Sequence, residues 1–269
     1  LGLLKLKING FGPVHKSWTF VKECCLKRNW EGVVLKVMGA KDFTLEVTGR
    51  DEITPDFLRV HVRDGGLLER SGLHPTMWIR LWFNDSGKAH QRAYTLVNAS
   101  PADGTFSMDF AMHDGVAADW ARSVQPGDTI DATVQGSSFT FPHPAPRRIW
   151  LVGDPASIPA VNSLLEERQR VAAGAAPVTA WLEYQHDADT SLEVRTSDSD
   201  VVTWIPRKRD GAALVEEVCG ALTADTVSVS EDFFWIACEA SSTRAIVKHL
   251  RKELGVDKHR IDALGYWRV

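Results

Sequence analysis

The sequence predicts a two-lobed protein, in which an N-terminal antiparallel Greek-key β-barrel is followed by a parallel-sheet α/β lobe. Short runs of alternating polar and apolar residues fill positions 31–145, and turn residues separate them, which is typical of an antiparallel sandwich or barrel. After residue 148, fully apolar runs alternate with amphipathic helical stretches, which indicates a parallel sheet covered on both faces. The stretch "FPHPAPRR" (141–148) between them is proline-rich, as domain linkers often are.

The first lobe is expected to contain seven strands and one helix. Residues 115–124, "GVAADWARSV", have a helical pattern that Pro126 and Gly127 end. Residues 1–28 lack a clear period, so we expect an N-terminal extension before a barrel domain at 29–143. The expected strands cover 32–40, 43–53, 57–64, 77–83, 92–98, 105–113 and 129–136.

The second lobe, 144–269, is expected to alternate strands with helices. Its apolar strands are predicted at 148–154, 178–185, 200–207 and 232–240, and its helices at 156–171, 211–222 and 242–255. The remaining residues, "DKHRIDALGYWRV" (257–269), follow the last helix. Two lobes joined by a linker form a crevice, which is a common place for a small-molecule site.

Composition narrows the function. The chain has 269 residues, a net charge of −4 and a pI of about 6.2, so it lacks the basic field that general nucleic-acid binding requires. No stretch approaches the roughly 20 apolar residues of a membrane span. The sequence begins without Met and without a signal-peptide pattern, so we expect either a trimmed chain or a piece of a longer protein.

The four cysteines, Cys24, Cys25, Cys219 and Cys238, have no CxxC spacing, and the nine histidines are scattered. This pattern does not match an iron–sulfur cluster or a zinc site, so no metal ligands are predicted. A reducing compartment such as the cytoplasm is the simplest setting for these cysteines. Any redox cofactor is therefore expected to be organic.

Two stretches of the first lobe carry chemistry suited to a flat, charged cofactor. In "QRAYT" (91–95), Arg92 can clamp a phosphate, Tyr94 can lie against an aromatic ring, and Thr95 can bond a ring nitrogen. In "MHDGVAADWA" (112–121), small residues open a helix, where free N–H groups attract a pyrophosphate. The same residues also fit a mixed-polarity sheet edge and an ordinary strand–turn–helix capped by Asp114.

Five stretches taken together resemble one family. They are "QRAYT", "DFAMHDGVAADWARSVQPGD", "LVGDPASIPAVNSLLE", "WIACEASSTRAIVKHLRKELG" and the terminal "GYWR". In this order they are similar to siderophore-interacting proteins, which are FAD-binding members of the ferredoxin–NADP reductase-like superfamily. In sequence, these stretches are most similar to the siderophore-interaction domain of IrtA-type mycobactin ABC importers.

The resemblance implies site residues by position. For FAD it implies Arg92, Tyr94, Thr95, Asp109, Ala111, His113, Gly115, Ala117, Ala118, Trp120, Gly136, Ser137 and Ser138. For NADPH or NADH it implies Gly153, Asp154, Ser157, Cys238 and Glu239. For the substrate it implies Arg207, Arg209 and Trp267, and it implies no catalytic acid–base residue and no metal ligand.

Several of these positions also have plain structural interpretations. Asp154 fits the cap of a tight βα turn, Cys238 fits a buried core cysteine, and Trp267 fits lobe packing. The run 207–209 fits a solvated charge cluster. The cations Arg244, Lys248 and Arg251 fit either a 2′-phosphate contact or the wet face of a helix.

The resemblance implies an FAD-dependent ferric-siderophore reductase that uses NAD(P)H to reduce Fe(III) and release Fe(II). Flavin bridges a two-electron donor and a one-electron acceptor, so the chemistry belongs mainly to the cofactor. The implied partners are a ferric siderophore, with a mycobactin-like one as a candidate, and a fused or associated ABC importer. Two alternatives are a non-catalytic siderophore-binding or regulatory module and a flavin oxidoreductase with an organic acceptor.

Overall fold

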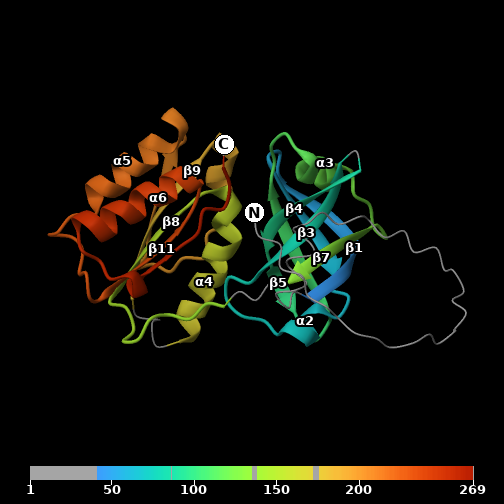
Figure 1. The fold of residues 1–269 in the computed structure, drawn as a ribbon, viewed down its shortest axis with the longest axis horizontal. Helices are drawn as coiled ribbons and strands as arrows, with labels where there is room; N and C mark the ends of the chain where they lie inside the picture. Colours follow the sequence, from blue (N-terminus) through green and yellow to red (C-terminus); the bar gives the residue numbers. More distant parts are fainter. Residues whose placement is uncertain (1–40, 86, 135–137, 172–175, 269) are drawn as a thin grey trace, which may run out of the picture.

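The computed structural model describes residues 41–85, 87–134, 138–171 and 176–268. Within that part, the strands form two separate sheets (Figure 1). The first sheet is antiparallel and lies between Lys41 and Val134, and the second is parallel and lies between Arg148 and Ala263. The predicted antiparallel and parallel sheets are confirmed, and the predicted domain boundary at 143/144 falls between them.

The first sheet is built from seven described strands in the order β4-β3-β7-β1-β2-β6-β5. Their bounds are β1 Lys41–Thr54, β2 Phe57–Arg63, β3 Trp78–Asp85, β4 Lys88–Thr95, β5 Val97–Ser100, β6 Thr105–Ala111 and β7 Thr129–Val134. Helix α2 (Leu67–Ser71) follows β2, and helix α3 (Val116–Ser123) follows β6. Every strand pair of this sheet is antiparallel.

This first sheet is rolled into a barrel. Strands β4 and β5 stand at opposite ends of the hydrogen-bonded order, yet only Leu96 separates them in the chain. A flat sheet cannot place its two outer strands next to each other, so the sheet curls until they meet. The single strand predicted at 92–98 is therefore two strands that meet at a sharp transition. Residues 92–98 contain no glycine or proline, so local pattern does not separate the two strands.

Alternation along the strands builds the core of the barrel. In β2, Val60 and Val62 are fully buried, whereas Arg59, His61 and Arg63 lie on the other face. Leu45 of β1 and Leu81 of β3 are fully buried in the same core. The period-two pattern thus became an inward apolar face, as expected for a half-buried sheet.

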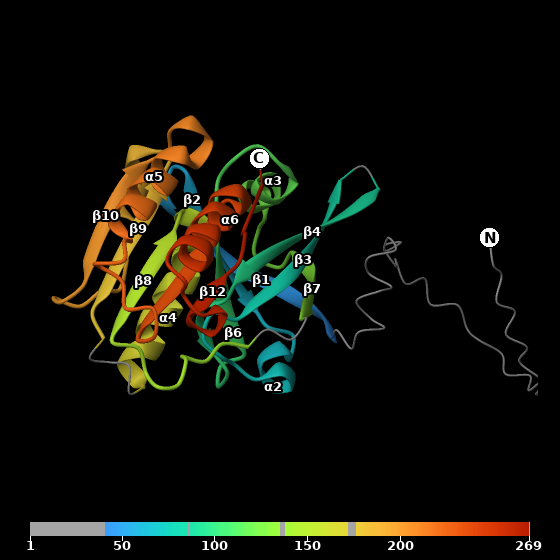
Figure 2. The ribbon, with the colours of Figure 1, turned by 60° about the vertical axis from the view of Figure 1, so that its left-hand side comes forward.

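The second sheet has the order β10-β9-β8-β11-β12. Its strands are β8 Arg148–Gly153, β9 Val178–Tyr184, β10 Val201–Pro206, β11 Asp232–Ala237 and β12 Ile261–Ala263. Helices α4 (Ile158–Arg170), α5 (Ala212–Ala221) and α6 (Ala240–Lys248) connect them, and α5 and α6 lie together on one face while α4 lies on the other (Figures 1 and 2). All six residues of β11 are buried, as a strand covered on both faces requires.

Two parts of the fold differ from the sequence expectation. The short helix α2 and the edge strand β12 were not predicted, because five and three residues are too few for a periodic signal. The helix predicted at 242–255 begins earlier and changes at His249–Glu253 into a π-helical turn. The expected strand at 32–40, the expected extension 1–28, and Cys24 and Cys25 lie outside the described residues.

Helix α4 is fixed to the sheet by a buried ion pair. Arg168 donates to both carboxylate oxygens of Asp200, at 2.6 and 2.7 Å, and the two side chains are 1% and 0% exposed. Asp200 also accepts hydrogen bonds from the N–H groups of Val178 and Ser197, at 2.9 and 2.8 Å. Burial alone would raise the pKa of Asp200, but these donors outweigh it and lower that pKa to about 2.

Candidate functional site

One half of the candidate site is an aromatic wall on the barrel. The ring of Tyr94 on β4 packs against Phe110 on β6, with centroids 4.2 Å apart, and Phe110 lies 5.7 Å from Trp120 of α3. Burial raises the pKa of the Tyr94 phenol, so the hydroxyl stays protonated. The structure therefore gathers predicted residues from β4 and α3 around one aromatic cluster.

Arg92 projects from the same strand. It lies two positions from Tyr94, so both side chains leave the same face of β4. The Arg92 side chain is exposed, and its Nη1 donates to the carbonyl of Gln91, at 2.8 Å. The strand therefore carries an exposed planar cation two positions from the ring of Tyr94.

At the start of α3, a glycine is followed by buried alanines. Gly115 has a φ of 146°, which favours glycine, and it precedes the first free N–H groups of the helix. Ala117 and Ala118 are buried at 4% and 3% exposure, so their side chains face the barrel core. Any anion at this helix start would therefore meet the main chain of Gly115 and its neighbours, and the alanines let the helix pack closely.

The other residues predicted for FAD are more scattered. Asp109 makes a two-pronged ion pair with Arg59, at 2.7 and 2.9 Å, so its carboxylate is already occupied. Ala111 packs at the contact between the lobes, and His113 is exposed, with its ring bonded to the carbonyl of Asp114. Ser138 is exposed. Gly136 and Ser137 lie outside the described residues.

The other half of the site is the carboxyl edge of the parallel sheet. The chain builds β8, β9 and β10 outward and then returns to place β11 on the other side of β8. This reversal between β8 and β11 is the switch point at which doubly wound sheets bind ligands. Gly153 ends β8 and Asp154 follows it, whereas Cys238 and Glu239 follow β11, so the predicted dinucleotide residues converge at this point.

Gly153 leaves no room for a side chain. A Cβ atom there would lie 2.4 Å from Oγ of Ser157 and 3.3 Å from Leu182. Ser157 is fully buried, and its hydroxyl bridges the N–H and carbonyl of Asp154, both at 2.9 Å. The tight βα turn that the sequence suggested is thus present, and Gly153 is required there because Ser157 and Leu182 fill the space that a side chain would need.

Asp154 is a buried acid with an unused oxygen. Its Oδ2 accepts a 2.7 Å hydrogen bond from Nε1 of Trp267, whereas its buried Oδ1 has no partner. Burial raises the pKa of Asp154 to about 7, the bond from Trp267 opposes that rise, and the charge of Glu183 adds to it. An unpartnered buried carboxylate oxygen is costly unless a ligand supplies a donor.

Glu183, at the end of β9, was not predicted from the sequence. It forms an ion pair with Nη1 of Arg207, whose guanidinium lies 4.7 Å from the ring of Trp267. Burial raises the pKa of Glu183, although Arg207 opposes this. Oε1 of Glu183 and Nη2 of Arg207 are buried without partners. A glutamate at the end of an otherwise apolar strand was the available signal.

The last strand ends in a thiol and a helix cap. Cys238 is fully buried, and burial together with the charge of Asp154 raises the pKa of its thiol. The carboxylate of Glu239 accepts from the N–H groups of Ser241 and Ser242, at 2.6 and 3.1 Å, at the start of α6. Burial opposes ionisation of Glu239, but these donors prevail and lower its pKa.

The C-terminal tail joins the two halves. Tyr266 shares a side-chain hydrogen bond with Thr95 of the barrel, and its N–H donates to the carbonyl of Cys238, at 2.9 Å. Trp267 bonds Asp154, as described, and its carbonyl accepts from the N–H of Ala240. Burial raises the pKa of Tyr266. The predicted positions Thr95, Asp154 and Trp267 therefore belong to one connected set.

A cationic groove of about 540 Å³ runs between α6 and this tail. Its cationic lining residues are exposed and form no ion pair with any other residue that the structure describes. Apolar lining comes from Val247 and from Leu264, which is 50% exposed. The cations are Arg244, Lys248, Arg251, Lys252 and Arg268, and of these only Lys252 and Arg268 were not noted from the sequence.

The two arginines predicted to meet the substrate are engaged elsewhere. Arg207 is held by Glu183 and Trp267 at the sheet edge. Arg209 pairs with Glu216 on the surface, and both side chains are 62% exposed.

Among the residues that the structure describes, no group of three His, Cys, Asp or Glu side chains is arranged to hold a metal ion. None of the described helices is both long and apolar enough to cross a bilayer.

Comparison with known proteins agrees with this geometry. Residues 74–136 match the siderophore-interacting FAD-binding domain, and residues 146–269 match the siderophore-interacting protein family. The first match confirms the prediction of FAD as a cofactor. The two matches divide at the linker, one on each lobe.

Individual relatives extend the comparison. The chain is 34% identical to the mycobactin import ATP-binding/permease protein IrtA of Mycobacterium tuberculosis over 91% of its own length and 28% of that protein. It is 25% identical to the NADPH-dependent ferric-chelate reductase of Escherichia coli over 61% of each. The chain thus spans less than a third of the importer.

A solved structure confirms the fold. The siderophore-interacting protein of Acinetobacter baumannii superposes with a TM-score of 0.72 at 20% identity, covering 85% of this chain and 91% of that one. Two lobes of the expected kinds, their order and the two family matches lead to one conclusion. The chain belongs to the siderophore-interacting protein family.

Proposed function

We propose that this chain is an FAD-dependent ferric-siderophore reductase that draws its electrons from NADPH or NADH. The observation that carries the proposal is the C-terminal tail, which ties the barrel strand of Tyr94 and Thr95 to the carboxyl edge of the parallel sheet through Tyr266 and Trp267. A flavin site and a dinucleotide site on these two elements would face each other. That arrangement suits electron transfer between two cofactors.

The barrel residues fit a flavin. Arg92 offers unused donors for a phosphate, and the wall of Tyr94, Phe110 and Trp120 suits a flat aromatic ring. The main chain at Gly115 offers free N–H groups at a helix start. We assign these groups to the FAD phosphates and rings, and we assign Thr95 to the edge of the isoalloxazine.

The sheet edge fits the reactive half of a nicotinamide dinucleotide. Three buried polar atoms there lack partners among the residues that the structure describes: Oδ1 of Asp154, Oε1 of Glu183 and Nη2 of Arg207. Hydroxyl and amide groups of a ribose or carboxamide would satisfy them. Cys238, buried and kept protonated by its surroundings, would border the site as a neutral wall.

The chain itself needs no acid–base pair. The flavin held by the barrel residues would supply the redox chemistry that links a two-electron donor to Fe(III), which is the substrate. The residues of the chain would bind and orient the two cofactors and exclude water from the site. The buried Asp154 and the protonated Tyr94 and Tyr266 keep the region around the two cofactors low in charge.

We place the ferric siderophore in the cationic groove between α6 and the tail. An anionic ferric chelate would find the cations Arg244, Lys248 and Arg251 without competing carboxylates, and the groove's volume suits a small molecule. The groove begins beside Ala240 and Gly265, next to the switch point. This placement differs from the predicted Arg207 and Arg209, whose guanidinium groups already have carboxylate partners.

The importer relative supports a further proposal about context. A siderophore carried inward by an ABC importer arrives loaded with Fe(III) at the cytoplasmic face of the membrane. A reductase lobe fused to or associated with such an importer, and exposed to the cytoplasm, would release the iron on arrival. We therefore propose an importer as the partner of this chain.

Anaerobic visible spectroscopy tests the proposal. Purified protein is supplied with FAD, then with NADPH or NADH, and then with a ferric siderophore and an Fe(II) chelator. Bleaching of the flavin, followed by its reoxidation and by Fe(II) capture, is the expected result. Flavin that binds but stays oxidised would instead favour a binding module, and reoxidation only by organic acceptors would favour the oxidoreductase alternative.

A further inference from the structure

The loop between β9 and β10 has a fixed shape that spans both lobes. We define residues 186–196 as the interlobe strap. At its start the buried carboxylate of Asp189 accepts from the N–H groups of Gln185 and His186, both at 3.0 Å. At its end Asn162 of α4 donates to the carbonyl of Glu193 and accepts from the N–H of Arg195, both at 2.9 Å.

The strap touches the barrel along its length. Near its start, Nδ1 of His186 lies 3.6 Å from Oδ2 of Asp56, in the turn between β1 and β2. In its middle, Leu192 packs with Phe57 of β2 and Ile158 of α4 in a small buried apolar cluster. Near its end, Arg195 crosses to the barrel. The strap thus connects the parallel-sheet lobe to two places on the first lobe, the adjacent residues Asp56 and Phe57 and, through Arg195, Asn98 of β5.

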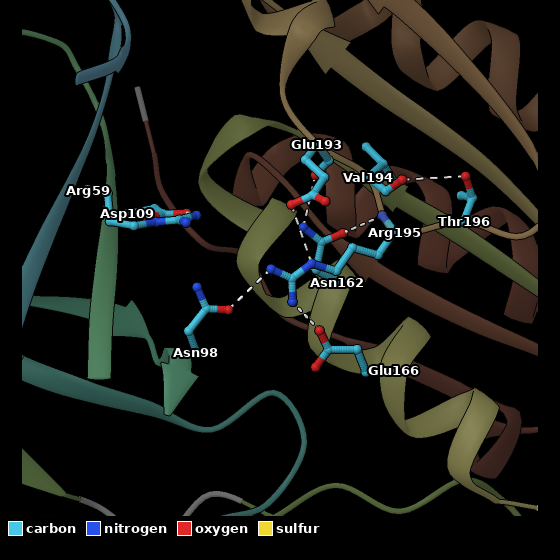
Figure 3. Close-up of polar contacts among 9 residues, drawn as sticks. All are labelled: Arg59, Asn98, Asp109, Asn162, Glu166, Glu193, Val194, Arg195 and Thr196. Carbon is cyan, nitrogen blue, oxygen red and sulfur yellow. Dashed lines mark hydrogen bonds and ion pairs between the residues drawn. The ribbon is translucent and has the colours of Figure 1, made fainter. Parts of the chain in front are cut away.

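Arg195 is the polar centre of this contact. Its Nη2 donates to Oδ1 of Asn98 on β5, at 3.2 Å, while its Nη1 pairs with Glu166 of α4 (Figure 3). Its Nε lies 3.5 Å from Glu193. Because both carboxylates belong to its own lobe, they hold the planar guanidinium in one orientation. The guanidinium therefore presents its Nη2 edge to Asn98 of the barrel.

Two barrel residues that contact the other lobe have unusual backbone conformations. Asn98 has a φ of 50°, and Thr76, whose N–H donates to Oγ of Ser163 on α4 at 3.0 Å, has a φ of 57°. A β-branched residue at positive φ is a genuine outlier, and such conformations persist where surrounding contacts fix them. Both outliers bond α4 or the strap. The barrel is therefore shaped for one orientation of its neighbour.

We propose that Arg195 is a positioning residue, which locks the orientation of the two lobes and so sets the distance between the flavin and dinucleotide sites. The inference rests on the proposed function for its effect on rate. Hydride transfer needs the reacting atoms about 3–3.5 Å apart, and a misplacement of about 1 Å costs on the order of a hundredfold in rate. Arg195 touches neither site, so its effect would pass through lobe geometry alone.

The test compares Arg195→Ala, Asn98→Ala and Arg195→Lys with the wild type as FAD-loaded protein. We expect the two alanine variants to bind FAD as the wild type does, with flavin reduction at saturating NADPH or NADH slowed at least about tenfold. The lysine variant should be intermediate, since it keeps the charge without the fork. The double variant should be no slower than either single variant, because both remove the same bond.

A second readout does not depend on activity. Limited proteolysis of the linker 141–147, with small-angle scattering, reports whether the lobes separate. Both should show looser lobes in the alanine variants, and Arg170→Ala, whose partner Glu167 lies on its own helix, should match the wild type. Unchanged reduction would overturn the positioning role, and unchanged proteolysis and scattering would overturn the lock. If the wild type itself is not reduced, the proposed function fails, but these two measurements still decide the lock.

Discussion

The indole Nε1 of Trp267 donates a 2.7 Å hydrogen bond to Oδ2 of Asp154, 113 residues earlier in the chain, and leaves the second oxygen of that carboxylate buried without a partner. Arg207 covers the same indole at 4.7 Å. The tail therefore contacts only one of the two carboxylate oxygens of Asp154, at the end of β8. In the proposed function, this unsatisfied oxygen would accept a hydrogen bond from the dinucleotide.

The first prediction concerns pH. Burial raises the pKa of Asp154 from its ordinary 3.8 to about 7. Between these values the folded chain keeps a proton that the unfolded chain has released, so the contribution of Asp154 to stability is complete below about pH 4 and is lost as the pH rises through 7. Asp154→Asn should therefore gain stability relative to the wild type over this window, by up to about 1.4 kcal/mol per pH unit.

Denaturant unfolding at about pH 4.5, about pH 6 and about pH 8 measures the difference in unfolding free energy between Asp154→Asn and the wild type. Asp225→Asn, which changes an exposed aspartate, is the matched control and should track the wild type at every pH. A constant difference between Asp154→Asn and the wild type would show that this carboxylate titrates normally.

The second prediction concerns flavin binding. Arg92→Ala removes the one guanidinium that stands on the same strand face as Tyr94. Loss of a charge-assisted phosphate contact should weaken FAD binding by about tenfold or more while the barrel stays folded, as fluorescence titration and circular dichroism would show. Arg63→Ala, an exposed cation on β2, should bind FAD normally. An unchanged FAD affinity in Arg92→Ala would remove Arg92 from the site.

The third prediction concerns the acceptor. Arg244→Glu combined with Lys248→Glu reverses the charge of the groove between α6 and the tail. KM for an anionic acceptor such as Fe(III)–EDTA should rise by about tenfold, and the salt dependence of the rate should shrink, because the attraction is electrostatic. A cationic acceptor such as ferrioxamine B should not show that rise. Steady-state Fe(II) release measures both acceptors.

Two comparisons make the groove experiment specific. Lys258→Glu adds the same kind of charge reversal at an exposed position outside the groove and should leave KM unchanged. Arg209→Glu tests the position that the sequence predicted. A rise in KM with Arg209→Glu, and none with the groove variant, would return the substrate to the position near 207–209.

The fourth prediction concerns the buried pair of Arg168 and Asp200. Asp200→Asn leaves the guanidinium buried without its counter-charge, which should cost about 3–5 kcal/mol of unfolding free energy. The pKa of Asp200 is lowered to about 2, so its stabilising contribution is present above about pH 4 and is lost as the pH falls through 2. Urea unfolding at neutral and acidic pH checks both statements.

Glu167→Gln is the comparison for this pair. Glu167 and Arg170 form an ion pair on the surface of the same helix, so removing it should change stability by less than about 1 kcal/mol. Equal costs for Glu167→Gln and Asp200→Asn would mean that burial gives the inner pair no special weight.

Local patterns predicted much of the fold. Alternation predicted the inward Val60 and Val62, and continuous apolar runs predicted the fully buried β11. The turn at Gly153 and the helix at α3 followed from glycine, proline and small residues. These features depend on neighbours in sequence, so a single chain reveals them. The division of residues 92–98 between β4 and β5 did not follow, because only barrel closure requires it.

The sequence by itself determined two lobes, their order, the family resemblance and the residue types at each strand end. Only the tertiary structure decided which side chains meet: Glu183 with Arg207, Trp267 with Asp154, Tyr266 with Thr95, and Arg195 with Asn98. Periodicity encodes which face of an element is buried, whereas a pairing across tens of residues depends on how packed elements are oriented in space. The cations of the groove could be read from the sequence, but only the structure shows that they form no ion pair with the other residues it describes.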